Sequence, residues 1–383
     1  MWLDQPPDPD TPLAGLRVLE LARVLAGPFA GQILADLGAD VIKVESPEGD
    51  GTRQWGPPWV TRENGDREAA YYHACNRGKR SVVADFAVAE DLALVKSLCA
   101  EADVVIENFK PGTLAKFGLD YVSVSAEDPA VIYCSITGFG QDGPRRDEPG
   151  YDFVVQAMSG LMSITGEPGG APMKSGVSIS DLACGLWSAN AIQAALLMRH
   201  RTGKGQWIDM ALLDCSVALL ANQAMGYFAN GRNPPRMGNA HAQVVPYGVY
   251  PTAEGHVVLA PANDRLFRAL AHLLERPDLA ADTRLQDNAG RIEHRAWLDG
   301  EIAAESRRWR QQDLLDACAR AGVPAGPIHD LAAVFADPQV IARGMAITPG
   351  GIPGVRSPFR FSDAELSLDE PSPTHGQHGK ATR

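Results

Sequence analysis

The 383-residue sequence lacks the features that mark a structural metal site, a disulfide scaffold or a membrane protein. Its six cysteines are widely spaced without a CxxC pair, and its nine histidines include no HExxH motif. We therefore expect neither a bound metal nor a disulfide framework. No apolar run approaches the roughly 18 residues of a membrane span, and the acidic, proline-rich first ten residues are unlike a signal peptide. These absences predict a protein of the reducing cytoplasm that has no membrane partner.

Several nucleotide and hydrolase motifs are also missing. The first glycine-containing loop, Leu25–Gly31, lacks the GxGxxG pattern that lets a backbone approach a dinucleotide pyrophosphate. Neither the GxxxxGK[ST] phosphate loop nor the GxSxG nucleophile elbow occurs in the sequence. These gaps argue against nicotinamide or flavin enzymes, kinases and serine hydrolases.

The charge balance is acidic. Asp and Glu number 47 against 35 Lys and Arg, which gives a formal net charge of −12. A nucleic-acid backbone would be repelled by this balance, so we expect no nucleic-acid partner. Apolar residues make up 45% of the chain and charged residues 21%, which is typical of a globular protein, and the length suits two domains.

Strands and helices alternate through the first third of the chain, which predicts an α/β fold with a parallel sheet. The expected strands are 16–21, 40–45, 81–86, 103–108 and 130–135. Ligands bind beyond the carboxyl ends of such strands, so the loops that follow them are the first place to look for chemistry.

The later sequence is richer in long helices. They include an expected helix over 209–228, and a hairpin of strands 247–250 and 256–260 follows. We predict a large domain over 13–225, a small α+β domain over 226–330, a return segment over 331–370, and flexible tails at 1–12 and 371–383.

Three features of the sequence allow two interpretations each. The basic run Asn76–Ser81 is either a solvated surface or a phosphate-binding cluster. Asp181 precedes a long apolar helix, where it would either cap the helix or act as a covalent nucleophile. Tyr151 either packs in the core or lines a ligand cleft. The residues alone leave all three open.

Taken in order, many short motifs resemble those of the class III CoA-transferases, also called the CaiB/BaiF family. The matching segments are 15–21, 26–28, 37–45, 76–81, 103–112, 150–152, 203–206, 237–240, 321–327 and 337–338. Each motif is short, but together they run from about residue 13 to 365 in the order and spacing of the family.

This resemblance implies a Rossmann-like large domain built from both ends of the chain, a small middle domain, and a homodimer of two interlocked chains. It aligns Asp181 with a catalytic aspartate that forms anhydride and CoA-thioester intermediates. Coenzyme A enters as a substrate, and no permanently bound cofactor is expected. The CoA-binding residues implied by the resemblance are Val24, Leu25, Ala26, Asn108, Phe109, Lys110, Lys116 and Tyr151.

The resemblance also bears on the acid substrate, through Gly238, Asn239 and His241. Members that handle oxalate carry a run of glycines after the Gly-Asn-Ala motif, where this chain has the segment 241–244. The region is more similar to members that use succinyl-CoA and dicarboxylate acceptors. A cationic adenine partner of some members corresponds to Ser46 here.

Two other functions remain as alternatives. An α-methylacyl-CoA racemase of the same fold would carry a histidine at the position of Tyr151, and a tyrosine is a poor base near neutral pH. The other alternative is a nucleotide-binding protein without catalysis, which loss of CoA exchange on changing Asp181, with CoA binding retained, would exclude. The transferase interpretation is preferred to both.

Overall fold

The computed structural model describes residue 2 and residues 8–379, in two compact units. The first unit draws on the ranges 1–162, 174–232 and 338–383, and the second on 163–173 and 233–337. The sequence pattern does not predict that the short segment 163–173 belongs with the second unit. Within the described residues, no helix is both long and apolar enough to cross a membrane.

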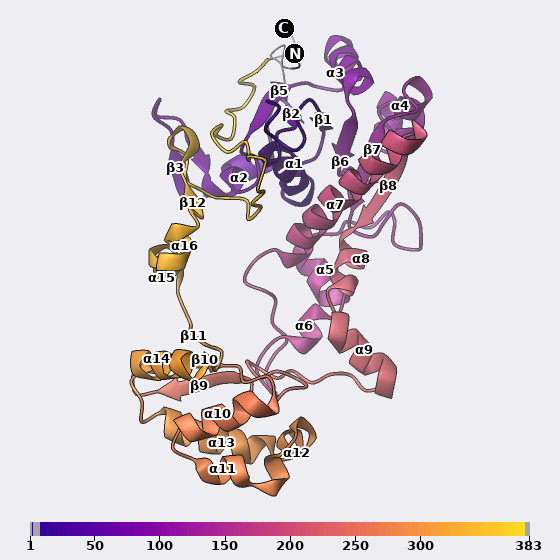
Figure 1. Ribbon diagram of the computed structural model, residues 1–383. Coiled ribbons are helices and arrows are strands. Elements are labelled where there is room, and N and C mark those ends of the chain that lie inside the picture. Colours follow the sequence, from indigo (N-terminus) through magenta and orange to yellow (C-terminus); the bar gives the residue numbers. More distant parts are fainter. Residues whose placement is uncertain (1, 3–7, 380–383) are drawn as a thin grey trace. The chain divides into compact units, whose positions relative to one another are not determined.

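A six-stranded parallel sheet forms the centre of the first unit, as the alternating pattern predicts (Figure 1). Its strands, in spatial order, are β5 (Lys79–Val83), β2 (Asp40–Glu45), β1 (Arg17–Glu20), β6 (Val104–Glu107), β7 (Ile132–Thr137) and β8 (Gln206–Ala211). The chain adds strands outward from β1 in one direction and then, from β6 onward, in the other. The crevice beyond the carboxyl ends of β1 and β6 is therefore the expected ligand position.

Both faces of this sheet are covered, because neighbouring residues of each strand face opposite sides. Val18 packs in one apolar cluster with α1 (Ala26–Asp36) and α7 (Ile179–Thr202). Leu19 packs in another with α3 (Ala89–Glu101) and α4 (Tyr121–Glu127). The strands β1, β2, β6 and β7 are buried on both sides, which fixes their register and the positions of the loops at their ends.

The prediction of one helix over 209–228 is wrong for its first residues, which form a strand, and the remainder is divided into two helices. Residues 206–211 form β8, which pairs with β7 from Gln206 opposite Ile132 to Ala211 opposite Thr137. The helices α8 (Leu212–Ala218) and α9 (Ala221–Asn230) follow, and Ala221, the first residue of α9, has a φ of 39°. The apolar residues of this stretch satisfy a helical period, but the open edge of β7 offers a ladder of hydrogen bonds that the sequence does not reveal.

The second unit contains the predicted hairpin, formed by β9 (Gly248–Thr252) and β10 (Gly255–Leu259), with β11 (Ala325–Pro327) antiparallel to β10. Its core includes Phe267, Leu298 and Leu314. These come from the helices α10 (Asp264–Leu273), α13 (Arg295–Ser306) and α14 (Gln311–Ala321), beside α11 (Pro277–Ala281), α12 (Asn288–Glu293) and η3 (Thr283–Leu285). The unit is α+β.

The remaining elements are short. They are η1 (Gly51–Gln54), β3 (Trp59–Thr61), β4 (Arg67–Ala69), α2 (Ala70–His73), η2 (Leu114–Phe117), α5 (Asp152–Met158), α6 (Leu161–Ile164), α15 (Leu331–Ala336), α16 (Pro338–Ala342), β12 (Ala346–Ile347), η4 (Pro349–Gly351) and β13 (Gly354–Val355). Two of them, η1 and α2, matter for the site because they stand beside the end of β2.

Several described residues of both tails are packed, whereas the sequence led us to expect flexible tails over 1–12 and 371–383. Near the start of the chain, Trp2 and Thr11 are buried. At the other end, His378 N–H donates to Ser81 O at 2.9 Å, and Val83 N–H donates to Gly379 O at 3.0 Å. The C-terminal residues thus complete the open edge of β5, a role that their polar composition does not predict. Residues 1, 3–7 and 380–383 of these tails lie outside the described residues.

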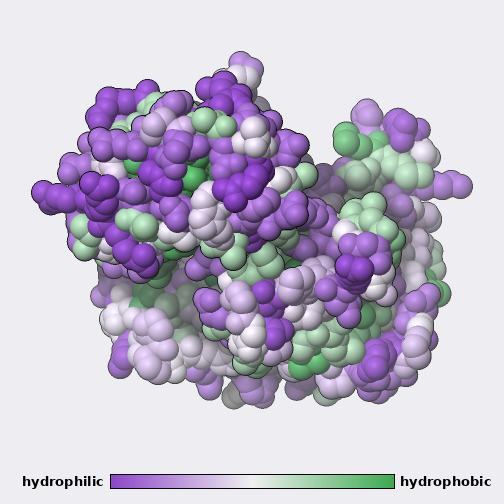
Figure 2. Space-filling model, turned by 90° about the horizontal axis from the view of Figure 1, so that it is seen from below, coloured by the Kyte–Doolittle hydropathy of each residue, from purple (hydrophilic) through white to green (hydrophobic). Residues whose placement is uncertain are grey.

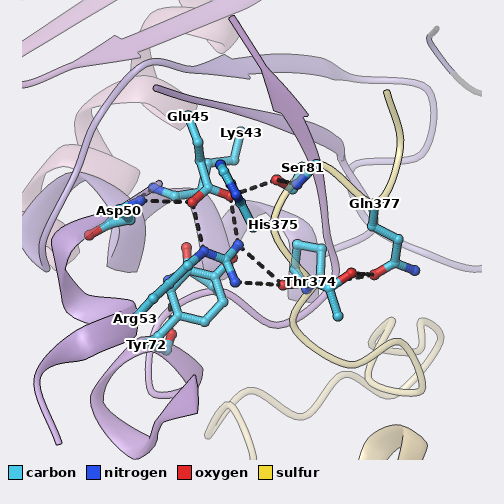
Figure 3. Close-up of polar contacts among 12 residues, drawn as sticks. Lys43, Glu45, Asp50, Arg53, Tyr72, Ser81, Thr374, His375 and Gln377 are labelled. Carbon is cyan, nitrogen blue, oxygen red and sulfur yellow. Dashed lines mark hydrogen bonds and ion pairs between the residues drawn. The ribbon is translucent and has the colours of Figure 1, made fainter. Parts of the chain in front are cut away.

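Buried charges join this C-terminal segment to the loop after β2 (Figure 3). Arg53 donates to Glu45 at 2.8 Å from Nε and at 2.6 Å from Nη2, and its Nη1 donates to Pro373 O at 3.2 Å. Arg53 also forms an ion pair with Glu68. Burial raises the pKa of Glu45, but the stronger combined effect of Arg53 and its other partners holds that pKa at about 2. The loop is therefore held by an ionised, fully partnered network.

We predict that Arg53→Met lowers the free energy of unfolding by about 3–5 kcal/mol, because it leaves Glu45 and Glu68 without their buried cation. The measurement is urea unfolding followed by circular dichroism at pH 7. The matched control is Arg145→Met, which breaks a half-exposed ion pair with Glu148 and should cost less than about 1 kcal/mol. Equal shifts in the two variants would contradict a special role for the buried network.

Candidate active site

Two strand-end loops meet at the crevice between β1 and β6. Arg23 N–H donates to Asn108 Oδ1 at 2.8 Å, and Asn108 Nδ2 donates back to Arg23 O at 2.7 Å. Asn108, one of the residues implied by the resemblance, therefore ties the loop after β6 to the loop after β1. The two strand-end loops are therefore bonded to each other at this position.

The next residue, Val24, has an unusual backbone conformation. Its φ is 71°, a region that valine rarely adopts, and its N–H donates to Asp50 Oδ2 at 3.2 Å. Lys43 in turn holds Asp50 at 3.0 Å, and both side chains are fully buried. Such strain persists only where the surroundings enforce it, and it is concentrated at functional sites.

Helix α1 begins immediately afterwards, at Ala26. No side chain caps its N-terminus at Leu25, and its first turn has no acidic residue. Val24, Leu25 and Ala26 thus form a fixed turn at the carboxyl edge of the sheet. The backbone N–H groups of such a turn favour negative charge.

The loop after β6 is positioned by the strand that precedes it. Phe109 N–H donates to Glu107 Oε2 at 2.7 Å, and burial raises the pKa of Glu107 to about 7. Lys110 and Lys116 are exposed, and neither forms an ion pair with any described residue. This edge is therefore locally basic although the chain as a whole is acidic.

Asp181 lies within the first turn of α7 rather than before it. The helix begins at Ile179 with Ser178 as its N-cap residue, so the interpretation of Asp181 as the N-cap is wrong. The capping role belongs in part to Asp152, whose Oδ1 accepts the Ser180 N–H at 2.9 Å. Sequence reasoning missed this residue, although it stands next to Tyr151 in the Gly-Tyr-Asp motif.

The electrostatics of Asp181 are unfavourable for a carboxylate. Burial, followed by repulsion from the nearby Asp152, raises the pKa of Asp181 from its ordinary value to about 7. A helix N-terminus alone would lower that pKa. Burial and the second carboxylate therefore outweigh the helix dipole, and perturbation of this kind is common at catalytic groups.

Close packing brings α7, the helix of Asp181, to the turn at 24–26. Gly185 follows Asp181 by about one helical turn, and a Cβ atom at Gly185 would lie 2.8 Å from Ala26 O. Only glycine therefore permits this approach of α7 to the start of α1. The helix that carries the predicted nucleophile therefore packs directly on the predicted CoA-binding turn, within the first unit.

Two aromatic residues that sequence reasoning missed adjoin this site. Tyr71, in α2, forms a hydrogen bond with Ser178, and burial raises the pKa of its phenol, to which the Asp181 carboxylate contributes. Trp55 packs edge-on against Tyr71 with ring centroids 5.2 Å apart. Tyr151, the predicted residue, is 65% exposed and precedes α5 directly. The sequence carried no signal that would have singled out Tyr71 or Trp55.

The basic run Asn76–Ser81 is neither a solvated surface nor a phosphate-binding cluster. Lys79 is buried and lies 2.7 Å from Glu20, and Arg77 is buried and lies 2.6 Å from Asp36. Arg80 forms an ion pair with Asp40. These cations neutralise carboxylates of β1, α1 and β2, which the linear sequence could not match to them.

Gly238, Asn239 and His241 belong to the second unit. Gly238 has a φ of 58° and, with Asn239, lines a cavity of about 450 Å³ whose wall also includes Tyr250, Asp299 and Arg307. His241 does not line it, and its ring packs on Tyr247 at 5.1 Å between centroids. The structure therefore groups the first two residues around one cavity and leaves His241 outside its wall.

Comparisons with known proteins show which family the chain resembles throughout its length. The model of CoA-transferase family III matches residues 13–379. A succinate–glutarate CoA-transferase of Agrobacterium fabrum is 54% identical over 97% of this chain and 95% of its own length. A succinyl-CoA:glutarate CoA-transferase of Mus musculus is 40% identical over 99% of this chain and 88% of its own. The crystal structure of a CaiB/BaiF family protein from Brucella suis is 56% identical, covers 97% of this chain and 98% of that one, and has a TM-score of 0.88.

We predict that Asp181→Asn stabilises the protein in a pH-dependent manner. The pKa of Asp181 is raised on folding to about 7, so between about pH 4 and pH 7 the unfolded chain ionises this group and the folded chain does not. The wild type therefore loses stability relative to the Asn variant as the pH rises through this range. The expected gain is roughly 2–4 kcal/mol at pH 8 and close to zero at pH 4.

The measurement is the urea midpoint of both proteins at a series of pH values. The variant at low pH is its own control, because there both side chains are neutral. A pH-independent difference between the two proteins would contradict the raised pKa of Asp181.

Proposed function

We propose a reaction for this chain from one premise: it belongs to CoA-transferase family III and is an enzyme of that class. In the proposed reaction, CoA moves from succinyl-CoA to a dicarboxylic acid acceptor such as glutarate. Support for these substrates comes from the names of the relatives from Agrobacterium fabrum and Mus musculus. The observation that carries the chemistry is Asp181, a carboxylate of raised pKa in the first turn of α7, a helix that packs on the start of α1 where Gly185 meets Ala26.

The proposed reaction proceeds in four exchanges. The Asp181 carboxylate attacks the thioester carbonyl of the donor, which releases CoA thiolate and leaves a mixed anhydride. The thiolate attacks the aspartyl carbonyl, which releases the donor acid and forms an aspartyl-CoA thioester. The acceptor carboxylate attacks that thioester and again releases the thiolate. The thiolate then attacks the acceptor side of the new anhydride, which forms the new acyl-CoA and restores Asp181.

The environment of Asp181 suits this role. A nucleophile with a pKa near 7 is ionised in about half of the molecules at neutral pH, and its carboxylate is more basic than an ordinary one. The anhydride and the thioester are neutral at this side chain, so each intermediate relieves the repulsion from Asp152 and the cost of a buried charge. Exclusion of water would then protect both intermediates from hydrolysis.

We assign the CoA molecule to the carboxyl edge of the sheet, on Val24, Leu25, Ala26, Asn108, Phe109, Lys110 and Lys116. The unpaired lysines and the uncapped start of α1 support this placement, because the CoA phosphates carry several negative charges. Tyr151 is assigned to the thioester end, supported by its neighbour Asp152, which is bonded to the first turn of α7. The strand order around β1 supports the description of the first unit as Rossmann-like.

The carboxylic acid substrate is assigned to Gly238, Asn239 and His241 of the second unit. Support comes from the cavity that Gly238 and Asn239 line and from the φ of Gly238, which exposes backbone that other residues would cover. No permanently bound cofactor enters the proposed chemistry. We infer the cytoplasm as its compartment, supported by six buried cysteines that are all free.

We predict that succinyl-CoA alone, without an acceptor, labels Asp181. The anhydride and the aspartyl thioester are both electrophilic at this side chain, so hydroxylamine should convert Asp181 to a hydroxamate that peptide mass spectrometry locates. Asp181→Asn keeps the shape but removes the nucleophile, so it should bind CoA and lose at least about 1,000-fold in kcat, which is over 4 kcal/mol of activation free energy. Label on another residue, or turnover near the wild-type rate in the variant, would reject the mechanism.

We also propose that the enzyme is a homodimer of interlocked chains. Support comes from large apolar side chains that are exposed in one chain. They occur on α5, α7 and α9, and include Phe153 at 58%, Leu197 at 72%, Met225 at 64% and Phe228 at 74% exposure. Figure 2 shows hydrophobic residues gathered at several places on the face that it draws. Apolar surface of this extent is typical of protein interfaces.

Sedimentation velocity should give a dimer that persists on dilution to nanomolar concentration. Interlocked chains cannot separate without unfolding, so dissociation and loss of circular dichroism should occur together in urea. A folded monomer at low concentration would exclude the interlocked arrangement while leaving the transfer chemistry untouched.

A further inference from the structure

Arg23 stands at the same carboxyl edge, between the turn at 24–26 and the loop after β6. Both bonds between its backbone and Asn108 fix where the side chain starts. Its guanidinium carbon lies 5.3 Å from the centroid of the Phe109 ring, in a cation–π contact. The side chain is exposed, so the backbone is fixed while the cation faces solvent.

The arginine has no carboxylate partner among the residues that the structure describes. This sets it apart from Arg53, Arg77 and Arg80, which all hold carboxylates of the first unit. Asp50 accepts the N–H of the adjacent residue Val24, but its charge is neutralised by Lys43 rather than by Arg23. In a chain of net charge −12, an exposed arginine that forms no ion pair with a carboxylate of the described residues can bind an anionic ligand.

Three phenylalanine rings in contact, Phe109, Phe86 and Phe117, form an aromatic row that holds the Phe109 ring beside Arg23. Phe109 contacts Phe86 with ring centroids 6.2 Å apart, and Phe86 contacts Phe117 at 5.5 Å. Packing on the end of this row orders the planar guanidinium and leaves its N–H groups, at the rim of the plane, free to donate. A preordered arginine fork matches the oxygens of a phosphate group better than a mobile lysine does.

We propose that Arg23 binds a phosphate group of the CoA substrate, with Phe109 as the platform that orders its guanidinium. This inference rests on the proposed function for the identity of the ligand and adds a residue that neither the resemblance nor the comparisons assign. The role is recognition of CoA rather than chemistry at the thioester. Loss of Arg23 should therefore weaken binding of phosphate-containing substrates and leave the chemical step unchanged.

The first test is direct binding of free CoA, measured by calorimetry at fixed salt concentration. Arg23→Gln should raise Kd about 10- to 50-fold, the value of one charge-assisted phosphate contact. Arg23→Lys, which keeps the charge but loses the fork, should have an intermediate effect. Arg17→Gln is the matched control. Arg17 is the first residue of β1, the strand that precedes Arg23, and so lies at the opposite edge of the sheet. It also makes a cation–π contact, with its guanidinium carbon 5.8 Å from the centroid of the Trp2 ring. This control should bind CoA like the wild type.

The second test separates phosphate recognition from general damage. Arg23→Gln should raise KM for succinyl-CoA by a similar factor with little change in kcat, and it should leave kcat/KM for succinyl-pantetheine, which has no phosphate, as in the wild type. An equal loss with both thioesters, or an unchanged Kd for CoA, would overturn the role of Arg23. The binding arm needs no acyl donor, so a wild type that binds CoA but transfers nothing would reject the proposed reaction without deciding against Arg23.

Discussion

The buried ion pairs of Lys43 set the geometry on which the rest of the site depends. Lys43 lies 3.0 Å from both Glu20 and Asp50, with all three side chains inaccessible, and Asp50 holds the strained backbone of Val24. Buried ion pairs contribute little net stability because desolvation offsets their attraction, but loss of one partner is costly. Their effect here is positional. They hold the first turn at the carboxyl edge in a conformation that valine would not adopt alone, and the start of α1 follows from it.

Asp181 is likewise held in an energetically unfavourable environment by the packing around it. Packing of Gly185 on Ala26 draws the first turn of α7 into the site, and Asp152 is needed to bind the Ser180 N–H that this turn presents. The Asp152 carboxylate, which binds the first turn of α7, therefore also repels the Asp181 carboxylate in that turn. The fold tolerates this because the sheet and its two apolar faces supply stability elsewhere, which is the usual relation between a reactive group and its scaffold.

Much of the first unit could be predicted from the sequence, because buried parallel strands have continuous apolar runs and a regular alternation with helices. That order also identified the strand-end loops as the place to look for chemistry, but not the bonds between Arg23 and Asn108 that join two of them. Contacts that join distant segments could not be predicted in this way. The pairing of Lys79 with Glu20, the bond from Asp152 to Ser180 and the edge formed by residues 376–379 each depend on tertiary proximity. For the same reason β8 was missed, since its identity as a strand depends on the neighbouring β7.

The cations around the sheet fall into two groups, those that neutralise buried carboxylates and those that are exposed without a carboxylate partner among the described residues. Arg53, Arg77 and Lys79 are buried and each is matched to a carboxylate, so their charges are cancelled within the fold. Arg23, Lys110 and Lys116 are exposed at the loops beyond the strands, and no carboxylate of the described residues pairs with them. An acidic protein can bind a polyanion only where its positive charges are left uncancelled. The pairing pattern at these loops, rather than the count of basic residues, therefore supports the proposed placement of the CoA phosphates at this edge.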